Sequence, residues 1–120
     1  MFNNVKIGGQ EVPMLSLASV DIFYSHIFHE DPIKLQAGKD FDEGRLFDLI
    51  MKMGFVMAKY AETKDRKAML KLNEDAYIEW MEQFDRSDYL AALPDIRATY
   101  EGQNITHASE KKSNEEQTEK

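Results

Sequence analysis

Apolar residues recur at helical spacing from Phe41 to Ala61, and this stretch predicts the central helix of the protein. Its main apolar face consists of Leu46, Leu49, Ile50, Met53, Met57 and Tyr60. Phe47, Met51 and Phe55 continue the apolar surface around the side. A helix that is apolar around so much of its circumference is usually buried. We therefore expect the other elements to pack around it, and we expect a core that includes Leu46, Ile50, Met53, Met57 and Trp80.

Two residues of this helix carry more specific information. Asp42 is placed to be the N-cap, where a carboxylate accepts a hydrogen bond from a backbone N–H that has no helical partner. Gly54 lies in the middle of the helix, where glycine costs about 1 kcal/mol relative to alanine. We interpret Gly54 as a point of close approach by another helix.

Residues 4 to 14 predict a β-hairpin before the first helix. The two-residue turn Gly8-Gly9 tolerates the positive φ that a type I′ turn requires. The resulting register places Val5 opposite Val12 on one face and Lys6 opposite Glu11 on the other. Because an isolated hairpin is only marginally stable, we expect its valine face to pack on helices or to pair with another strand.

The segments on either side of the central helix are interpreted from the same periodicity. Residues 16 to 30 predict the first helix, with Ser16 or Ser19 as its N-cap. Residues 33 to 41 are expected to be a connector. The strongly charged residues 62 to 71 are expected to be a solvated continuation of the central helix or a loop.

The C-terminal part of the fold begins with a predicted third helix over residues 73 to 86, for which Asn73 is the N-cap. Ser87 can cap a further helical piece that reaches residue 100. Pro94 either kinks that piece or starts a new short helix as its first residue.

The chain changes character after residue 102. Residues 103 to 120 contain no aromatic residue, and their apolar residues are Ile105 and Ala108. Such a segment cannot bury enough surface to offset its ordering entropy, so we expect a disordered tail. The pattern as a whole predicts a mainly α fold: one small domain over residues 1 to 102, with about four helices and an N-terminal β-hairpin.

Composition narrows the functional classes. The 120 residues suffice for one domain with one core. No apolar run is long enough to span a bilayer. The N-terminus has no apolar signal-peptide region, because Asn3, Asn4 and Lys6 interrupt it, and cysteine is absent. We therefore expect a cytoplasmic protein without membrane contact. The net charge of −7 argues against binding to nucleic acid, because nucleic-acid binders present basic faces to phosphate.

Candidate chemistry is sparse. His26 and His29 lie one helical turn apart and could bind a metal, but the remaining histidine, His107, falls in the predicted tail. Solvated histidines explain the pair better. The sequence contains no glycine-rich phosphate loop and no recognisable acid–base or nucleophile motif. We expect a protein that is not an enzyme and has no cofactor, and a small helical enzyme or metal protein stays as an alternative.

A basic cluster follows the central helix. It consists of Lys64, Arg66, Lys67 and Lys71. Asp65 interrupts the cluster, which favours a solvated loop. A docking patch for an acidic segment is the alternative interpretation.

Three stretches resemble the tail assembly chaperones of long-tailed phages and prophages of Gram-positive bacteria. They are FYSHIFHEDPIK, LIMKMGFVMAKYAE and NEDAYIEWMEQFDRSDYLAALPDI, which together with the hairpin cover about residues 4 to 100. The resemblance implies a protein of the bacterial host cytoplasm that binds the tape measure protein and keeps it soluble while tail tube subunits assemble around it. It also implies no catalytic residue. A longer form made by a translational frameshift is implied too, for which the Glu-Lys-Lys stretch at 110 to 112 would be suited.

A client with exposed apolar helices requires an apolar surface on its partner. A body of about 100 residues cannot bury every apolar face, so we expect such a surface for the client and for self-association. Ile22, Phe28 and Ile78 are the candidate partner-binding residues, because each lies outside the centre of its apolar arc. A small acidic phage or bacterial regulator that binds and inhibits a protein partner is the alternative function.

Overall fold

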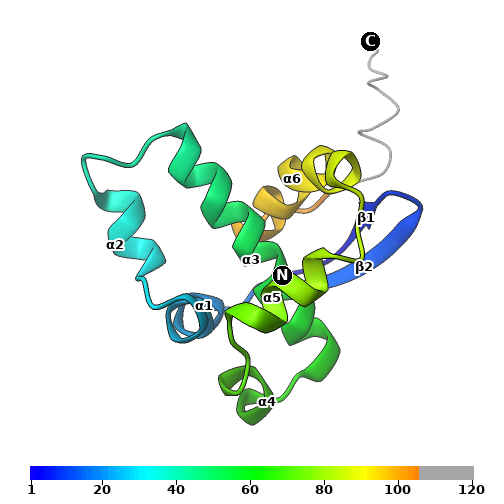
Figure 1. Cartoon of the computed structure of the whole chain (residues 1–120), viewed down its shortest axis with the longest axis horizontal. Helices are drawn as coiled ribbons and strands as arrows, with labels where there is room; N and C mark the ends of the chain where they lie inside the picture. The colour runs from blue at the N-terminus through cyan, green and yellow to red at the C-terminus, as the bar shows by residue number, and fades with distance from the viewer. Residues whose placement is uncertain (106–120) are drawn as a thin grey trace.

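Helix α3 (Glu43–Thr63) runs through the middle of the computed structural model, and the other elements pack around it (Figure 1). The structure describes residues 1–105. The elements within this range are, in chain order, β1 (Phe2–Ile7), β2 (Gln10–Leu15), α1 (Val20–Phe28), α2 (Pro32–Ala37), α3, α4 (Arg66–Leu70), α5 (Glu74–Met81) and α6 (Arg86–Tyr100). The predicted mainly α fold with an N-terminal hairpin is confirmed, and these residues hold six helices where about four were expected.

The hairpin has the predicted register. Val5 lies opposite Val12 and Lys6 opposite Glu11, and the pairing continues outward to Phe2 and Leu15. Gly8 in the turn has a φ of 65°, which glycine adopts without strain. Both valines are buried, because α3 packs against β2 and α6 packs against β1. The apolar face of the hairpin therefore packs on helices rather than on another strand within the described chain.

The buried part of α3 forms the centre of the core. Ile50, Met53, Met57 and Trp80 are buried as predicted. Leu46 is only partly buried, so the prediction for this residue was wrong. Burial along α3 begins at Leu49, because the start of the helix extends beyond the elements that cover the rest of it. The predicted N-cap is confirmed, since the Asp42 side chain accepts a hydrogen bond of 3.0 Å from the backbone N–H of Arg45.

Gly54 is where α6 comes closest to α3. A Cβ atom at this position would collide with the hydroxyl of Tyr89 and would crowd Ile96, both on α6. The Tyr89 hydroxyl donates a hydrogen bond of 2.7 Å to the carbonyl of Met51, one turn before Gly54. The interpretation of Gly54 as a site of close helix approach is confirmed.

The first helix is shorter than predicted, and a helix replaces part of the expected connector. α1 begins at Val20, and Ser19 occupies its N-cap position as predicted. The Ser19 hydroxyl makes no capping hydrogen bond, and it donates to the Tyr60 hydroxyl over 3.2 Å instead. Pro32–Ala37 form α2, where the sequence pattern had indicated a connector. Asp31 caps α2 by accepting from the N–H groups of the first turn. A six-residue helix shows no repeated apolar face, so periodicity could not detect it.

The charged segment after α3 and the predicted third helix also differ from expectation. Residues 66–70 form α4, which Met69 anchors in the core with no exposed surface. α5 ends at Met81, before the predicted residue 86, and its predicted cap is confirmed by a 2.9 Å bond from the N–H of Ala76 to the Asn73 side chain. α6 is continuous through Pro94, so this proline does not start a new helix, and Asp85 rather than Ser87 occupies the N-cap position.

The fold extends past its predicted boundary at residue 102. The buried side-chain amide of Asn3 donates to the Thr99 hydroxyl over 2.9 Å and to the Gln103 carbonyl over 3.0 Å. Ile105 packs, partly buried, against the core. Gln103 and Ile105 therefore contact the rest of the fold, beyond the boundary predicted at residue 102. The remainder of the predicted tail, residues 106–120, lies outside the described residues.

Replacing Gly54 with alanine should destabilise the protein, although alanine favours helix formation. The added methyl must displace the hydrogen-bonded Tyr89, so we expect a loss of about 1–3 kcal/mol in the free energy of unfolding. Gly44→Ala is the matched control, because a Cβ there meets only Asp42 at an ordinary distance of 3.5 Å. Urea denaturation measures both variants. An unchanged midpoint for Gly54→Ala would contradict close contact at this position.

Truncation should locate the end of the folded chain. A chain that ends at Gly102 should be less stable than one that ends at Ile105 by about 1–2 kcal/mol, because the buried Asn3 amide loses an acceptor. Thermal unfolding of the two truncated chains gives the comparison. Equal melting temperatures would show that residues 103–105 do not contribute to the fold.

Candidate partner-binding site

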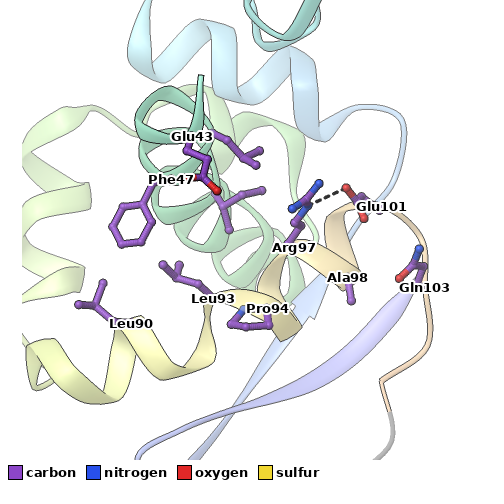
Figure 2. Close-up of a pocket in the computed structure, with 11 residues that line it drawn as sticks. Glu43, Phe47, Leu90, Leu93, Pro94, Arg97, Ala98, Glu101 and Gln103 are labelled. Carbon is purple, nitrogen blue, oxygen red and sulfur yellow. Dashed lines mark hydrogen bonds and ion pairs between the residues drawn. The ribbon is translucent and has the colours of Figure 1, made fainter. Parts of the chain in front are cut away.

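A groove of about 670 Å³ lies between the start of α3 and the outer side of α6 (Figure 2). Its apolar lining consists of Leu46, Phe47, Ile50, Leu90, Leu93, Pro94 and Ala98. Figure 2 shows Phe47 of α3 and Leu90 of α6 on one side of the groove, with the ion pair of Arg97 and Glu101 on the other. Phe47 leaves 46% of its surface exposed, which is a large fraction for phenylalanine, a residue that is usually buried.

The sequence of the two helices explains why this surface stays open. The apolar surface of α3 extends around its side to Phe47, and the core covers α3 only from Leu49 onward. On α6, Leu90 and Pro94 lie one turn apart and face the groove. Proline has no N–H, so the Leu90 carbonyl lacks the usual i+4 donor of an α-helix. The groove offers a mainly apolar lining.

A second, smaller hollow continues the apolar surface toward α5. It has a volume of about 240 Å³ and is lined by Phe47, Met51, Met81, Phe84, Arg86, Tyr89 and Leu90. The two hollows share Phe47 and Leu90, so they adjoin at these side chains. Methionine side chains adapt to partners of different shape. Together the hollows form one elongated apolar surface across α3, α5 and α6.

The rim of the larger groove is polar. Arg97 Nε donates to Glu101 Oε2 over 2.9 Å, which neutralises both charges. Glu43 and Gln103 complete the rim, and Glu43 forms no ion pair within residues 1–105. An apolar centre with a polar rim is the usual anatomy of a protein interface. This arrangement suits the apolar face of a helix, with room for a cation on that helix beside Glu43.

A polar cluster on the opposite side of α3 has a structural role. Tyr24 donates to Glu30 over 2.7 Å, and Lys52 binds Asp48 over 2.9 Å and Glu30 over 3.5 Å. Burial raises the pKa of Tyr24 far above its ordinary value, and Glu30 adds to the effect. Burial lowers the pKa of Lys52, but the bonds and charges of Asp48 and Glu30 raise it by more. Both pKa shifts lead away from neutral pH, so neither group titrates where an acid–base catalyst must.

The three candidate residues from the sequence are not brought together. Ile22 on α1 is 66% exposed and Ile78 on α5 is 55% exposed, as expected. Phe28 is only 7% exposed, so its expected availability to a partner was wrong. Its ring packs 5.2 Å from that of Tyr77, and the ammonium of Lys52 lies 5.2 Å above it. Residues at the edge of an apolar arc are buried when a second helix, here α5, covers that edge.

Sequence reasoning missed the groove itself. The signal was present at Phe47, which extends the apolar surface of the central helix beyond its main face. Leu90 gave no such signal, because leucine next to a predicted apolar face is ordinary. Only the crossing of α3 and α6 shows that the exposed Phe47 and the partly buried Leu90 line the same groove.

Other kinds of site find little support within residues 1–105. His26 Nε2 lies 2.7 Å from the carbonyl of Leu70, so this histidine holds α1 to α4. No group of three His, Asp or Glu side chains in this range could hold a metal ion, and His107 lies outside it. No helix in the same range combines the length and apolar composition needed to cross a membrane.

Alanine substitutions should distinguish the buried from the exposed candidates. Phe28→Ala should lower the free energy of unfolding by about 3–5 kcal/mol, because it leaves a cavity among aromatic rings. Ile22→Ala should change it by less than about 0.5 kcal/mol, as is usual at the surface. Chemical denaturation of both variants tests this. Similar losses for the two would contradict the placement of α1 against α5.

No family model, curated protein or solved structure matches this chain. The support for a function therefore comes from the chain itself. It consists of the open apolar groove between α3 and α6 and the exposed isoleucines.

Proposed function

We propose that this protein is a non-enzymatic tail assembly chaperone, which acts in the cytoplasm of a bacterial host. It binds apolar helical segments of a tape measure protein and keeps that protein soluble during tail tube assembly. The observation that carries the proposal is the apolar groove between α3 and α6. The resemblance of three stretches to such chaperones supports the proposed class of client.

The dimensions of the groove suit a short helical segment. Its α6 side is lined from Leu90 to Glu101, which at 1.5 Å per residue corresponds to roughly 16 Å, or about three turns of a partner helix. Helices bind such grooves through side chains at positions i, i+3 or i+4, and i+7. A tape measure protein, being long and helical, would offer many segments with this pattern.

The charge of the protein supports a solubilising role. Its net charge of −7 keeps a complex with an apolar client away from charge neutrality, and so away from precipitation. Glu43 at the rim would favour client helices that carry a lysine or arginine beside their apolar face. Contact with the tail tube protein is part of the proposal as a second step.

A longer, frameshifted form is also part of the proposal. Gln103, near the end of the described residues, lines the groove. The stretch from Glu110 to Lys112, where the frameshift is proposed, lies outside the described residues. Sequencing the coding region and detecting a larger product would test this part.

Co-expression with the candidate tape measure protein encoded downstream tests the function. We expect the client to be soluble and to co-purify when this protein is present, and to precipitate when it is absent. Phe47→Asp should weaken co-purification at least about tenfold while the protein stays folded, because the substituted side chain is half-exposed and lines both hollows.

Ile33→Asp is the matched control, because Ile33 is 61% exposed on α2 and lines neither hollow. It should leave co-purification unchanged. Equal solubility of the client with and without this protein would contradict the chaperone function. Equal loss from Phe47→Asp and Ile33→Asp would show that the groove is not the binding site.

A further inference from the structure

Charges of opposite sign are separated on the consecutive helices α4 and α5. The basic cluster around α4 consists of Lys64, Arg66, Lys67 and Lys71, and all four are exposed. No lysine or arginine occurs between residues 72 and 85. In that range α5 and the turn after it carry an acidic face, formed by the exposed residues Glu74, Asp75, Glu79 and Glu82.

Neither charged surface is neutralised within the described chain. The ion pairs in residues 1–105 join Lys52 to Glu30 and Asp48, Lys59 to Glu62, and Arg97 to Glu101. None involves the basic cluster or the acidic face. Asp65, which could offset the basic cluster, instead caps α4 by accepting from the N–H of Lys67 over 3.1 Å. Like charges this close on a helix repel one another, and an opposite charge from outside would remove that cost.

Each charged surface surrounds an exposed apolar side chain. Leu70 is 40% exposed and follows Arg66 and Lys67 by one helical turn. Ile78 is 55% exposed, with Glu74 one turn before it and Glu82 one turn after it. The two surfaces thus have the same plan, an apolar centre within a charged rim, but with opposite sign. An apolar centre and a charged rim are what a protein contact requires.

We propose that two copies of this chain form a two-fold dimer, in which the basic cluster of each copy docks on the acidic face of the other and Leu70 packs against Ile78. In a two-fold contact both copies use the same patch, so that patch must be complementary to itself. The two surfaces can meet this condition, because α4 and α5 follow one another in the chain with residues 71–73 between them, and both pack against α3. One contact then forms both complementary pairings at once.

The dimer does not rest on the proposed chaperone function. Its contact residues on α4 and α5 include none of the residues that line the larger groove. Each copy in the dimer would therefore keep its groove open to a client. The basic cluster, for which the sequence allowed a docking patch for an acidic segment, takes the α5 face of the second copy as that segment.

Sedimentation velocity of the full chain tests the dimer directly. We expect a dimer at 0.1 M NaCl and an increase in its Kd of at least about tenfold at 1 M NaCl, because the screening length falls from about 10 Å to about 3 Å. A monomer at 0.1 M NaCl and at concentrations of about 100 μM would overturn the proposal, as would a dimer that does not respond to salt.

Charge exchange tests which surfaces meet. One variant carries Arg66→Glu and Lys67→Glu, and the other carries Glu79→Lys and Glu82→Lys. Both should fold, because glutamate suits the first turn of α4 and lysine suits the last turn of α5. Each variant alone should be monomeric, and an equimolar mixture should restore a dimer that contains one copy of each. Circular dichroism verifies that both are folded.

Lys34→Glu with Lys39→Glu is the matched control, because it changes the net charge as much as the basic-cluster variant does, at exposed residues outside α4 and α5. It should still dimerise. A mixture of the two exchange variants that stays monomeric would overturn the proposal, as would either variant dimerising alone. Phe47→Asp should dimerise normally, so failure of the dimer and failure of client binding are separate results.

Discussion

The close contact between α3 and α6 at Gly54 is the interaction on which the rest of the structure depends. The missing side chain lets Tyr89 reach the carbonyl of Met51 across the interface. With α6 held in this position, its far end meets the hairpin, where the Thr99 hydroxyl accepts a hydrogen bond from the side-chain amide of Asn3. The contact between the central helix and the C-terminal helix thereby positions α6 against the N-terminal strands.

The same contact leaves an apolar surface uncovered. α6 lies tightly on α3 around Gly54, but the start of α3 extends beyond the core. Phe47 stays exposed there, and Leu90 is only partly buried beside it. Filling this space from within would require another element, and none in residues 1–105 occupies it. An exposed apolar groove of this size promotes aggregation when nothing covers it. Its presence therefore favours a role in binding a protein partner.

The larger groove and the charged surfaces use different residues. The larger groove lies on α3 and α6, whereas the separated charges lie on and beside α4 and α5. Apolar contacts suit a client whose helices vary in sequence, because they depend little on direction. Charge pairs specify register and orientation, which suits a contact between identical copies.

The sequence by itself determined the features that depend on neighbours in the chain: the central helix, the caps at Asp42 and Asn73, and the hairpin register. Caps, turns and periodicity act over a few residues, so they can be read from the sequence. Only the tertiary structure decided that Phe28 is buried while Phe47 is open. Whether an apolar side chain is covered depends on which distant helix lies over it, and the crossing of helices is set by the packing of the whole fold.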